Sequence, residues 1–141
     1  LAGLVAITPA AGFVEFMPAL FIGFIGGVIC YGGILLKHIF GYDDALDVVG
    51  IHGIGGTWGA LATGLFASSA VNGVDGLFYG NPHQVWVQIV SIAGTWVFVY
   101  AVSRIILKVV DLCIGLRVDA DSELSGLDLS QHNERGYSIQ Q

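Results

Sequence analysis

His52 is the residue whose side-chain type and position point most directly to chemistry. It lies in a run from Val48 to Ala67 that carries no formal charge and is long enough to cross a bilayer as a helix. An ionisable group at that depth is costly, so it usually faces a bundle interior or a water-filled path. A histidine in such a segment is therefore a candidate functional residue. The alternative is a neutral imidazole bonded to a neighbouring helix, and both interpretations stay open.

Three carboxylates, Asp43, Asp44 and Asp47, precede this run. A metal or proton site is one interpretation of them. Capping explains them fully, because carboxylates at a helix N-terminus accept the unpaired amide N–H groups and complement the helix dipole. We therefore expect a capped cytoplasmic loop, with no metal and no cofactor. Cys30 and Cys113 lack CxxC spacing and indicate neither a zinc site nor a disulfide.

A hydrolytic site is the third chemical alternative, since His52, Ser68 and Asp75 are residue types of a catalytic triad. No GxSxG elbow surrounds Ser68, which lies at the end of the uncharged run. We therefore expect no enzymatic activity.

Glycines crowd the uncharged run around His52. Small residues one helical turn apart let helix backbones approach closely. A helix of this kind suits the wall of a narrow path, although ordinary helix packing produces the same pattern. The residues expected at close helix contacts are Gly50, Gly53, Gly55, Gly56 and Gly59.

The elements that must position these residues follow from the composition. The 141 residues are 55% hydrophobic and 11% charged, whereas globular domains carry about 25% charge. Apolar runs at about 16–37, 44–67 and 84–116 are each long enough to span lipid. The sequence thus predicts an all-α polytopic membrane protein, with a membrane region over residues 1–117 and a cytoplasmic tail over 118–141.

Basic residues set the expected orientation. Lys37 follows the first run, and Arg104, Lys108 and Arg117 lie at the end of the third, so these ends should be cytoplasmic. The start of the chain must then lie outside, yet it has no signal peptide, which leads us to expect missing upstream helices. The net charge of −6 resides mostly in the tail, and five scattered Lys and Arg residues argue against nucleic-acid binding.

Short motifs are distributed in order along the chain. The membrane region contains Gly3-Leu4-Val5-Ala6-Ile7-Thr8-Pro9-Ala10, Asp43-Asp44 with Asp47, Gly50-Ile51-His52-Gly53 and Thr63-Gly64-Leu65-Phe66-Ala67. The tail contains Gly115-Leu116-Arg117-Val118, Gly126-Leu127-Asp128-Leu129-Ser130-Gln131-His132 and Glu134-Arg135-Gly136-Tyr137. Together these motifs resemble ammonium transporters of the Amt/Mep/Rh type over nearly the whole chain.

This resemblance implies a homotrimer of subunits with about eleven helices, each subunit having its own pore and two inverted halves. It implies that ammonium is recruited outside and loses a proton, and that ammonia then passes along a hydrophobic path lined by two hydrogen-bonded histidines. His52 matches the second histidine. The first would lie on N-terminal helices that are missing here. Thr8 matches a position near the outer vestibule.

The resemblance also implies that the tail contacts neighbouring subunits and regulates opening. Its matching residues are Gly126, Asp128, Ser130, His132, Glu134 and Tyr137. Ser130 lies where plant members carry a phosphorylated threonine, and an added phosphate would disturb docking of the tail. In many bacterial and archaeal members, PII-type signal proteins block the cytoplasmic pore exit, on the side where the three aspartates are expected.

The expected protein is therefore a multi-pass transporter of the plasma membrane that takes up ammonium as a nitrogen source. Two alternatives remain. One is an ammonium sensor with the same membrane domain fused to an output module. The other is a structural membrane subunit in which His52 serves packing alone.

Overall fold

The computed structural model describes residues 1–134, and this part of the chain is helical without a β-strand. The all-α expectation is confirmed for these residues. The elements are α1 (Ala2–Ile7), η1 (Thr8–Ala10), α2 (Phe16–Phe40), η2 (Val49–Ile54), α3 (Gly55–Phe66), α4 (Ser69–Asn72), η3 (Leu77–Tyr79), α5 (His83–Ile114), α6 (Ala120–Ser125) and α7 (Leu127–Ser130). Tyr137 of the expected regulatory tail lies outside the described residues.

The chain divides into two compact units, Leu1–Val97 and the residues from Phe98 onward. The first unit holds α1 to η3 and the beginning of α5. The second holds the rest of α5 together with α6 and α7. The expected boundary between membrane region and tail, at residue 117, stays a prediction.

Helix α2 begins as expected at Phe16 and is long and apolar enough to cross a membrane. Its 25 residues correspond to a length of about 37 Å. Pro18 lies in the first turn, where its missing N–H costs little. The helix continues three residues beyond the expected end at residue 37. It ends at Gly41, whose φ of 63° suits glycine and whose N–H donates to the Lys37 carbonyl at 2.8 Å.

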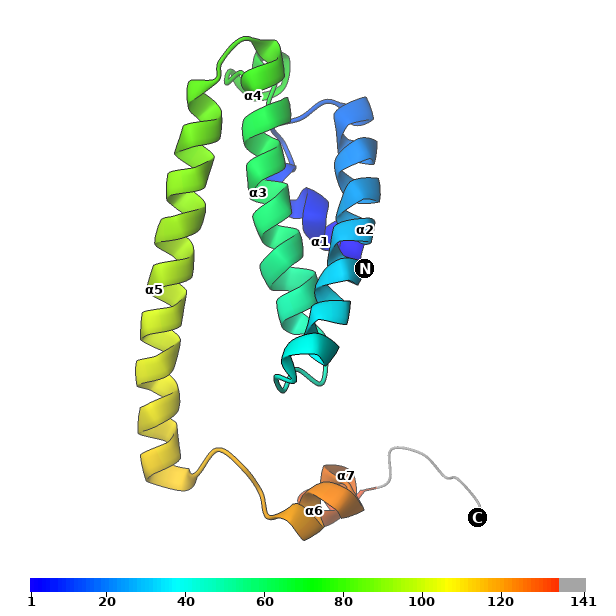
Figure 1. The fold of residues 1–141 in the computed structure, drawn as a ribbon, viewed down its shortest axis with the longest axis vertical. Coiled ribbons are helices and arrows are strands. Elements are labelled where there is room, and N and C mark those ends of the chain that lie inside the picture. The colour runs from blue at the N-terminus through cyan, green and yellow to red at the C-terminus, as the bar shows by residue number, and fades with distance from the viewer. Residues whose placement is uncertain (135–141) are drawn as a thin grey trace. The chain divides into compact units, whose positions relative to one another are not determined.

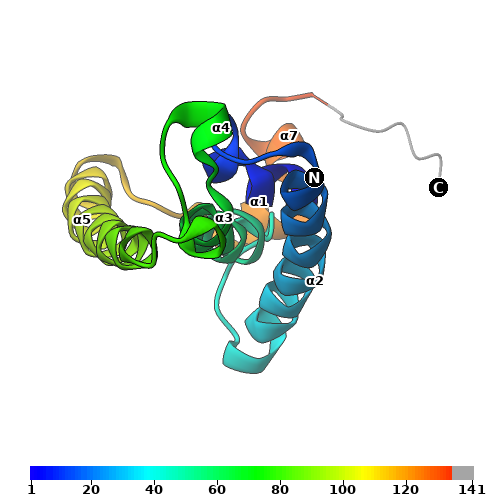
Figure 2. The same ribbon diagram turned by 90° about the horizontal axis from the view of Figure 1, so that it is seen from above.

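Helix α1 is a short element that packs against both α2 and α3, so the three form one bundle (Figures 1 and 2). Ala6 is fully buried at this junction. Pro9 falls in η1, a single 3-10 turn that follows α1 directly. The sequence analysis did not predict this helix, because six residues are too few to show a helical period.

The second expected span, 44–67, consists of two consecutive elements rather than one helix. Residues 44–47 form a loop, and Asp47 has a left-handed φ of 55°, which ends any helix there. The π-helix η2 follows and passes directly into α3, whose twelve residues end at Phe66. His52 therefore lies in a π-helical and not an α-helical segment.

The third expected span, 84–116, corresponds closely to α5, which covers His83–Ile114. It ends where Gly115 adopts a φ of 80°. Between α3 and α5, the expected polar loop contains α4 and η3, and glycines with positive φ terminate both. The described part of the expected tail contains α6 and α7, which contact each other.

Candidate functional site

His52 lies in the middle of η2, and its side chain is exposed in this chain. Its glycine neighbours contact other segments. A Cβ on Gly50 would lie 2.9 Å from the backbone nitrogen of Ile34, and one on Gly53 would lie 3.3 Å from the Trp96 ring. π-helical turns inside helices are frequent at functional sites. The backbone thus packs on two sides while the imidazole is left accessible.

The loop before η2 is tied down by charge-assisted hydrogen bonds. The two carboxylate oxygens of Asp44 accept the N–H groups of Val48 and Val49, at 2.9 and 2.8 Å. The Asp44 carboxylate thus accepts amide N–H groups at the start of η2, although the N-cap position itself is Val48. Lys37 forms an ion pair with Asp47 and donates to the Asp44 carbonyl at 2.9 Å. Two of the three aspartates are therefore engaged in fixing where η2 begins.

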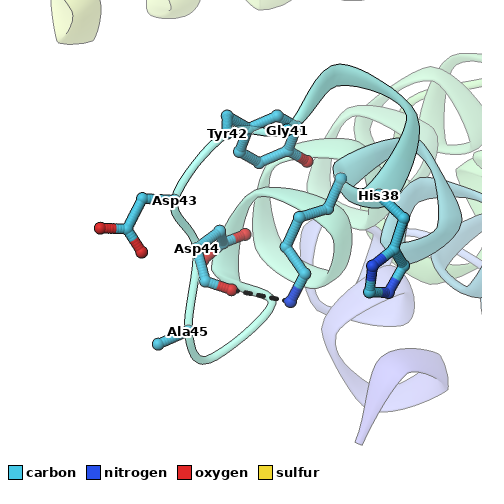
Figure 3. A pocket seen from close by; sticks show the side chains of 7 residues that line it. His38, Gly41, Tyr42, Asp43, Asp44 and Ala45 are labelled. Carbon is cyan, nitrogen blue, oxygen red and sulfur yellow. Dashed lines mark hydrogen bonds between the residues drawn. The ribbon is translucent and has the colours of Figure 1, made fainter. Parts of the chain in front are cut away.

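A shallow hollow lies at this end of α2 (Figure 3). Its volume is about 370 Å³, and its lining comes from the end of α2 and the loop that follows. The lining residues are Lys37, His38, Gly41, Tyr42, Asp43, Asp44 and Ala45. Among residues 1–134, no group of three or more His, Cys, Asp or Glu side chains is arranged to hold a metal ion.

Thr8 is the first residue of η1, away from the aspartate loop. Its hydroxyl donates to the Leu4 carbonyl at 2.7 Å. The following residue, Pro9, contacts α3 at Gly59, seven residues or about 10 Å beyond His52 along the helix axis. The order along the chain from the loop through η2 and α3 is thus the aspartate loop, then His52, then the level of Thr8. The structure does not bring Thr8 and His52 together.

A polar contact joins the end of α3 to the start of α2. Ser68, after α3, is buried, and its hydroxyl donates to the Glu15 carboxylate at 2.8 Å. Its backbone N–H donates to the Phe13 carbonyl at 2.9 Å. Ser68 therefore ties the end of α3 to the start of α2.

The glycines of α3 differ in what surrounds them. A Cβ on Gly55 would lie 2.6 Å from the Cys30 sulfur, and one on Gly59 would lie 2.1 Å from the Ala6 carbonyl oxygen. Gly56 has nothing within 4 Å of such a Cβ in the described residues. Close approach also occurs at Gly26, where an added Cβ would lie 2.2 Å from that of Ala6. The glycine spacing in α2 and α3 was the signal available for these contacts.

The described tail residues form a local network. Ser122 donates its backbone N–H and its hydroxyl to the Asp119 carboxylate, at 2.8 and 2.9 Å. These bonds lower the pKa of Asp119 below its ordinary value of 3.8. Gly126 has a φ of 94°, and the Ser130 hydroxyl donates to its carbonyl at 3.0 Å. Asp128 accepts the Glu134 N–H at its backbone carbonyl, at 2.9 Å.

His132 is the remaining tail residue singled out by the sequence, and it is exposed just after α7. Sequence reasoning also missed a contact near His52. The indole of Trp96 donates to the Thr57 hydroxyl at 3.0 Å. The two residues are 39 positions apart, so no local pattern indicated the bond.

Helix α2 is long and apolar enough to cross a membrane. His52 lies on a π-helical turn, a kind of turn that is frequent at functional sites. The chain belongs to the ammonium transporter family, because the profile of the Ammonium Transporter Family matches residues 1–137.

Individual relatives agree with this assignment. The chain is 56% identical over 140 residues to an ammonium transporter of Bacillus subtilis, which covers 97% of this chain and 35% of that protein. It is 45% identical over 138 residues to the ammonium transporter Amt1 of Archaeoglobus fulgidus, covering 98% of this chain and 35% of the relative. The chain thus spans about a third of the length of these curated relatives.

Solved structures show the same fold. The crystal structure of Saccharomyces cerevisiae Mep2 superposes with a TM-score of 0.78 at 37% identity, covering 85% of this chain and 29% of Mep2. Candida albicans Mep2 gives a TM-score of 0.76 at 32% identity, covering 86% of this chain and 28% of that protein. The chain therefore has the fold of a part of Mep2.

Proposed function

We propose that this chain forms part of an ammonium transporter and that His52 borders its conduction path. The observation that carries the proposal is the position of His52, exposed on a π-helical turn inside an uncharged segment of a family whose members are named ammonium transporters. An imidazole at this depth can hydrogen-bond ammonia or exchange a proton with it. A permanent charge there would be heavily penalised.

The remainder of the path is proposed to come from helices outside this chain. The first histidine of the pair would lie there, and Thr8 would lie near the outer vestibule. The loop of Asp43, Asp44 and Asp47 would face the cytoplasm, where a PII-type protein is a candidate regulator. This direction agrees with the order aspartate loop, His52, Thr8 along the segment.

The complete protein is proposed to be a homotrimer in the plasma membrane, with the tail in the cytoplasm. The tail residues Gly126, Asp128, Ser130, His132 and Glu134 would couple opening between subunits. Phosphorylation of Ser130 would place a phosphate where its hydroxyl now bonds Gly126, which would disturb this short helix.

The test compares the full-length parent protein with His52→Ala and His52→Glu at equal amounts in the membrane. His52→Ala should lower ammonium-dependent current at least about tenfold, the size of one lost hydrogen bond to the substrate or more. His52→Glu should alter selectivity, because it replaces an imidazole with a carboxylic acid. Growth of ammonium-limited cells provides the second readout.

His38→Ala is the matched control, because His38 lies at the end of α2 and outside the uncharged run. It should leave the current near the native level. If His52→Ala also carries a near-native current, His52 does not border the path, and a packing role is favoured.

A further inference from the structure

The hydroxyl group of Thr57 lies between two partners from different elements. It donates to the carbonyl of Gly53 at 2.7 Å, and it accepts the indole N–H of Trp96 at 3.0 Å. An indole can donate only, and a hydroxyl can do both, so the direction of this chain of bonds is fixed. The result is a continuous link from Trp96 on α5 through Thr57 on α3 to the backbone of η2.

The link ends at the residue that follows His52. Gly53 belongs to η2, and its Cα faces the Trp96 ring so closely that an added Cβ would lie 3.3 Å from the ring. Trp96 therefore contacts this turn in two ways, through its N–H by way of Thr57 and directly through its ring. Both contacts lie within the Leu1–Val97 unit.

A second threonine on the same helix shows what is specific about this link. Thr63 donates to the Gly59 carbonyl at 2.9 Å, with the same spacing of four residues. Bonds of this kind bend or loosen helices slightly. In the described residues, Thr57 has the indole donor and Thr63 does not, and the π-helical turn lies only at the Thr57 end.

We propose that Trp96 and Thr57 are positioning residues, which hold η2 in its π-helical form and thereby fix the direction of the His52 imidazole. A π-helix bonds each N–H to the carbonyl five residues back instead of four and is rare, so we expect other contacts to be needed to stabilise it. Reverting to α-helical hydrogen bonding would rotate His52 about the helix axis. This inference rests on the proposed function only in assigning the imidazole to the conduction path.

The experiment uses the full-length parent protein in lipid nanodiscs and in cells. Trp96→Phe keeps an aromatic ring but removes the N–H donor, and Thr57→Val removes the hydroxyl with little change in volume. The matched controls are Trp86→Phe, the same substitution on an exposed residue of α5, and Thr57→Ser, which retains the hydroxyl. The two readouts are hydrogen exchange of the amides over residues 49–57 and maximal ammonium current at equal protein amounts.

Trp96→Phe and Thr57→Val should each speed amide exchange over residues 49–57 and lower the maximal current, both by at least about twofold. Thr57→Ser and Trp86→Phe should stay near the native protein in both readouts. Faster exchange without a change in current would overturn the positioning role, and so would a lower current without faster exchange.

Failure of the proposed function has a different signature. If the native parent carries no ammonium current, the transport assignment is wrong, whereas the exchange data still decide whether the link holds η2. If Trp96→Phe exchanges like Trp86→Phe, the link itself is refuted, whatever the current.

Discussion

The bundle of α1, α2 and α3 and the short helices α6 and α7 are stabilised by different kinds of contact. In the bundle, glycine backbones meet neighbouring elements closely, as at Gly59 beside the Ala6 carbonyl. In the tail, side chains cap their own helices, as Asp119 does for Ser122. The bundle should therefore be sensitive to side-chain volume, and the tail to charge and pH.

The largest effect is expected from adding one methyl group inside the bundle. Gly59→Ala would place a Cβ 2.1 Å from the Ala6 carbonyl oxygen, so the backbone must move. Overpacking of this kind typically costs about 1–3 kcal/mol. Thermal unfolding of the full-length parent, followed by tryptophan fluorescence, should show a clearly lower Tm.

Gly56→Ala on the same helix is the control for that change. An added Cβ meets nothing within 4 Å there in the described residues. Alanine is favoured over glycine within a helix by about 1 kcal/mol. Its Tm should equal or exceed the native value. If both substitutions lower Tm equally, the effect of Gly59→Ala does not come from the close contact at Ala6.

An intermediate effect is expected at the loop before η2, where the bundle depends on a polar contact. Asp44→Ala removes both acceptors for the N–H groups of Val48 and Val49. Loss of such a cap costs about 1 kcal/mol. Asp44→Asn keeps one acceptor and should lower Tm less. If Asp44→Ala leaves Tm unchanged, the carboxylate is not required for the start of η2.

The smallest effect is expected in the tail and depends on pH. Because the pKa of Asp119 is lowered in the folded state, its carboxylate stabilises α6 above the ordinary value of 3.8. This contribution is lost as the pH falls below that value towards the folded-state pKa. Hydrogen exchange over residues 119–125, corrected for intrinsic rates, should therefore show less protection at about pH 3 than at about pH 5.

Asp119→Asn separates capping from titration. Asparagine still accepts the Ser122 N–H but has no proton to gain, so its protection should not change between the two pH values. The same loss of protection in Asp119→Asn and in the native protein would assign the pH effect to another group.

The sequence predicted the elements whose patterns are local and long. The apolar runs located α2 and α5 to within a few residues, because length and composition alone indicate such helices. The π-helical form of η2 was missed, since hydrophobic periodicity does not distinguish bonding to the fourth residue from bonding to the fifth. The start of η2 at Val49 follows the left-handed backbone of Asp47. An aspartate in the sequence does not by itself indicate that conformation.

The sequence predicted the central residue of the candidate site but not the contacts around it. His52 could be singled out because a histidine in an uncharged run is unusual. The hydrogen bond from Trp96 to Thr57 joins residues 39 positions apart, so no local pattern in the sequence indicates it. Helix α1 was likewise too short to recognise, although Gly3 and Ala6 are the small residues through which it packs.

Ala6 limits which amino-acid substitutions the junction of α1, α2 and α3 can accept during evolution. Its methyl group blocks a side chain at Gly26, whereas its backbone oxygen blocks one at Gly59. Ala6 and Gly26 can in principle exchange sizes, because replacing Ala6 by glycine removes the atom that an alanine at position 26 would meet. No residue at position 6 removes the backbone oxygen that faces position 59. Side-chain size can therefore change jointly at Ala6 and Gly26, but no change at position 6 makes room for a side chain at Gly59.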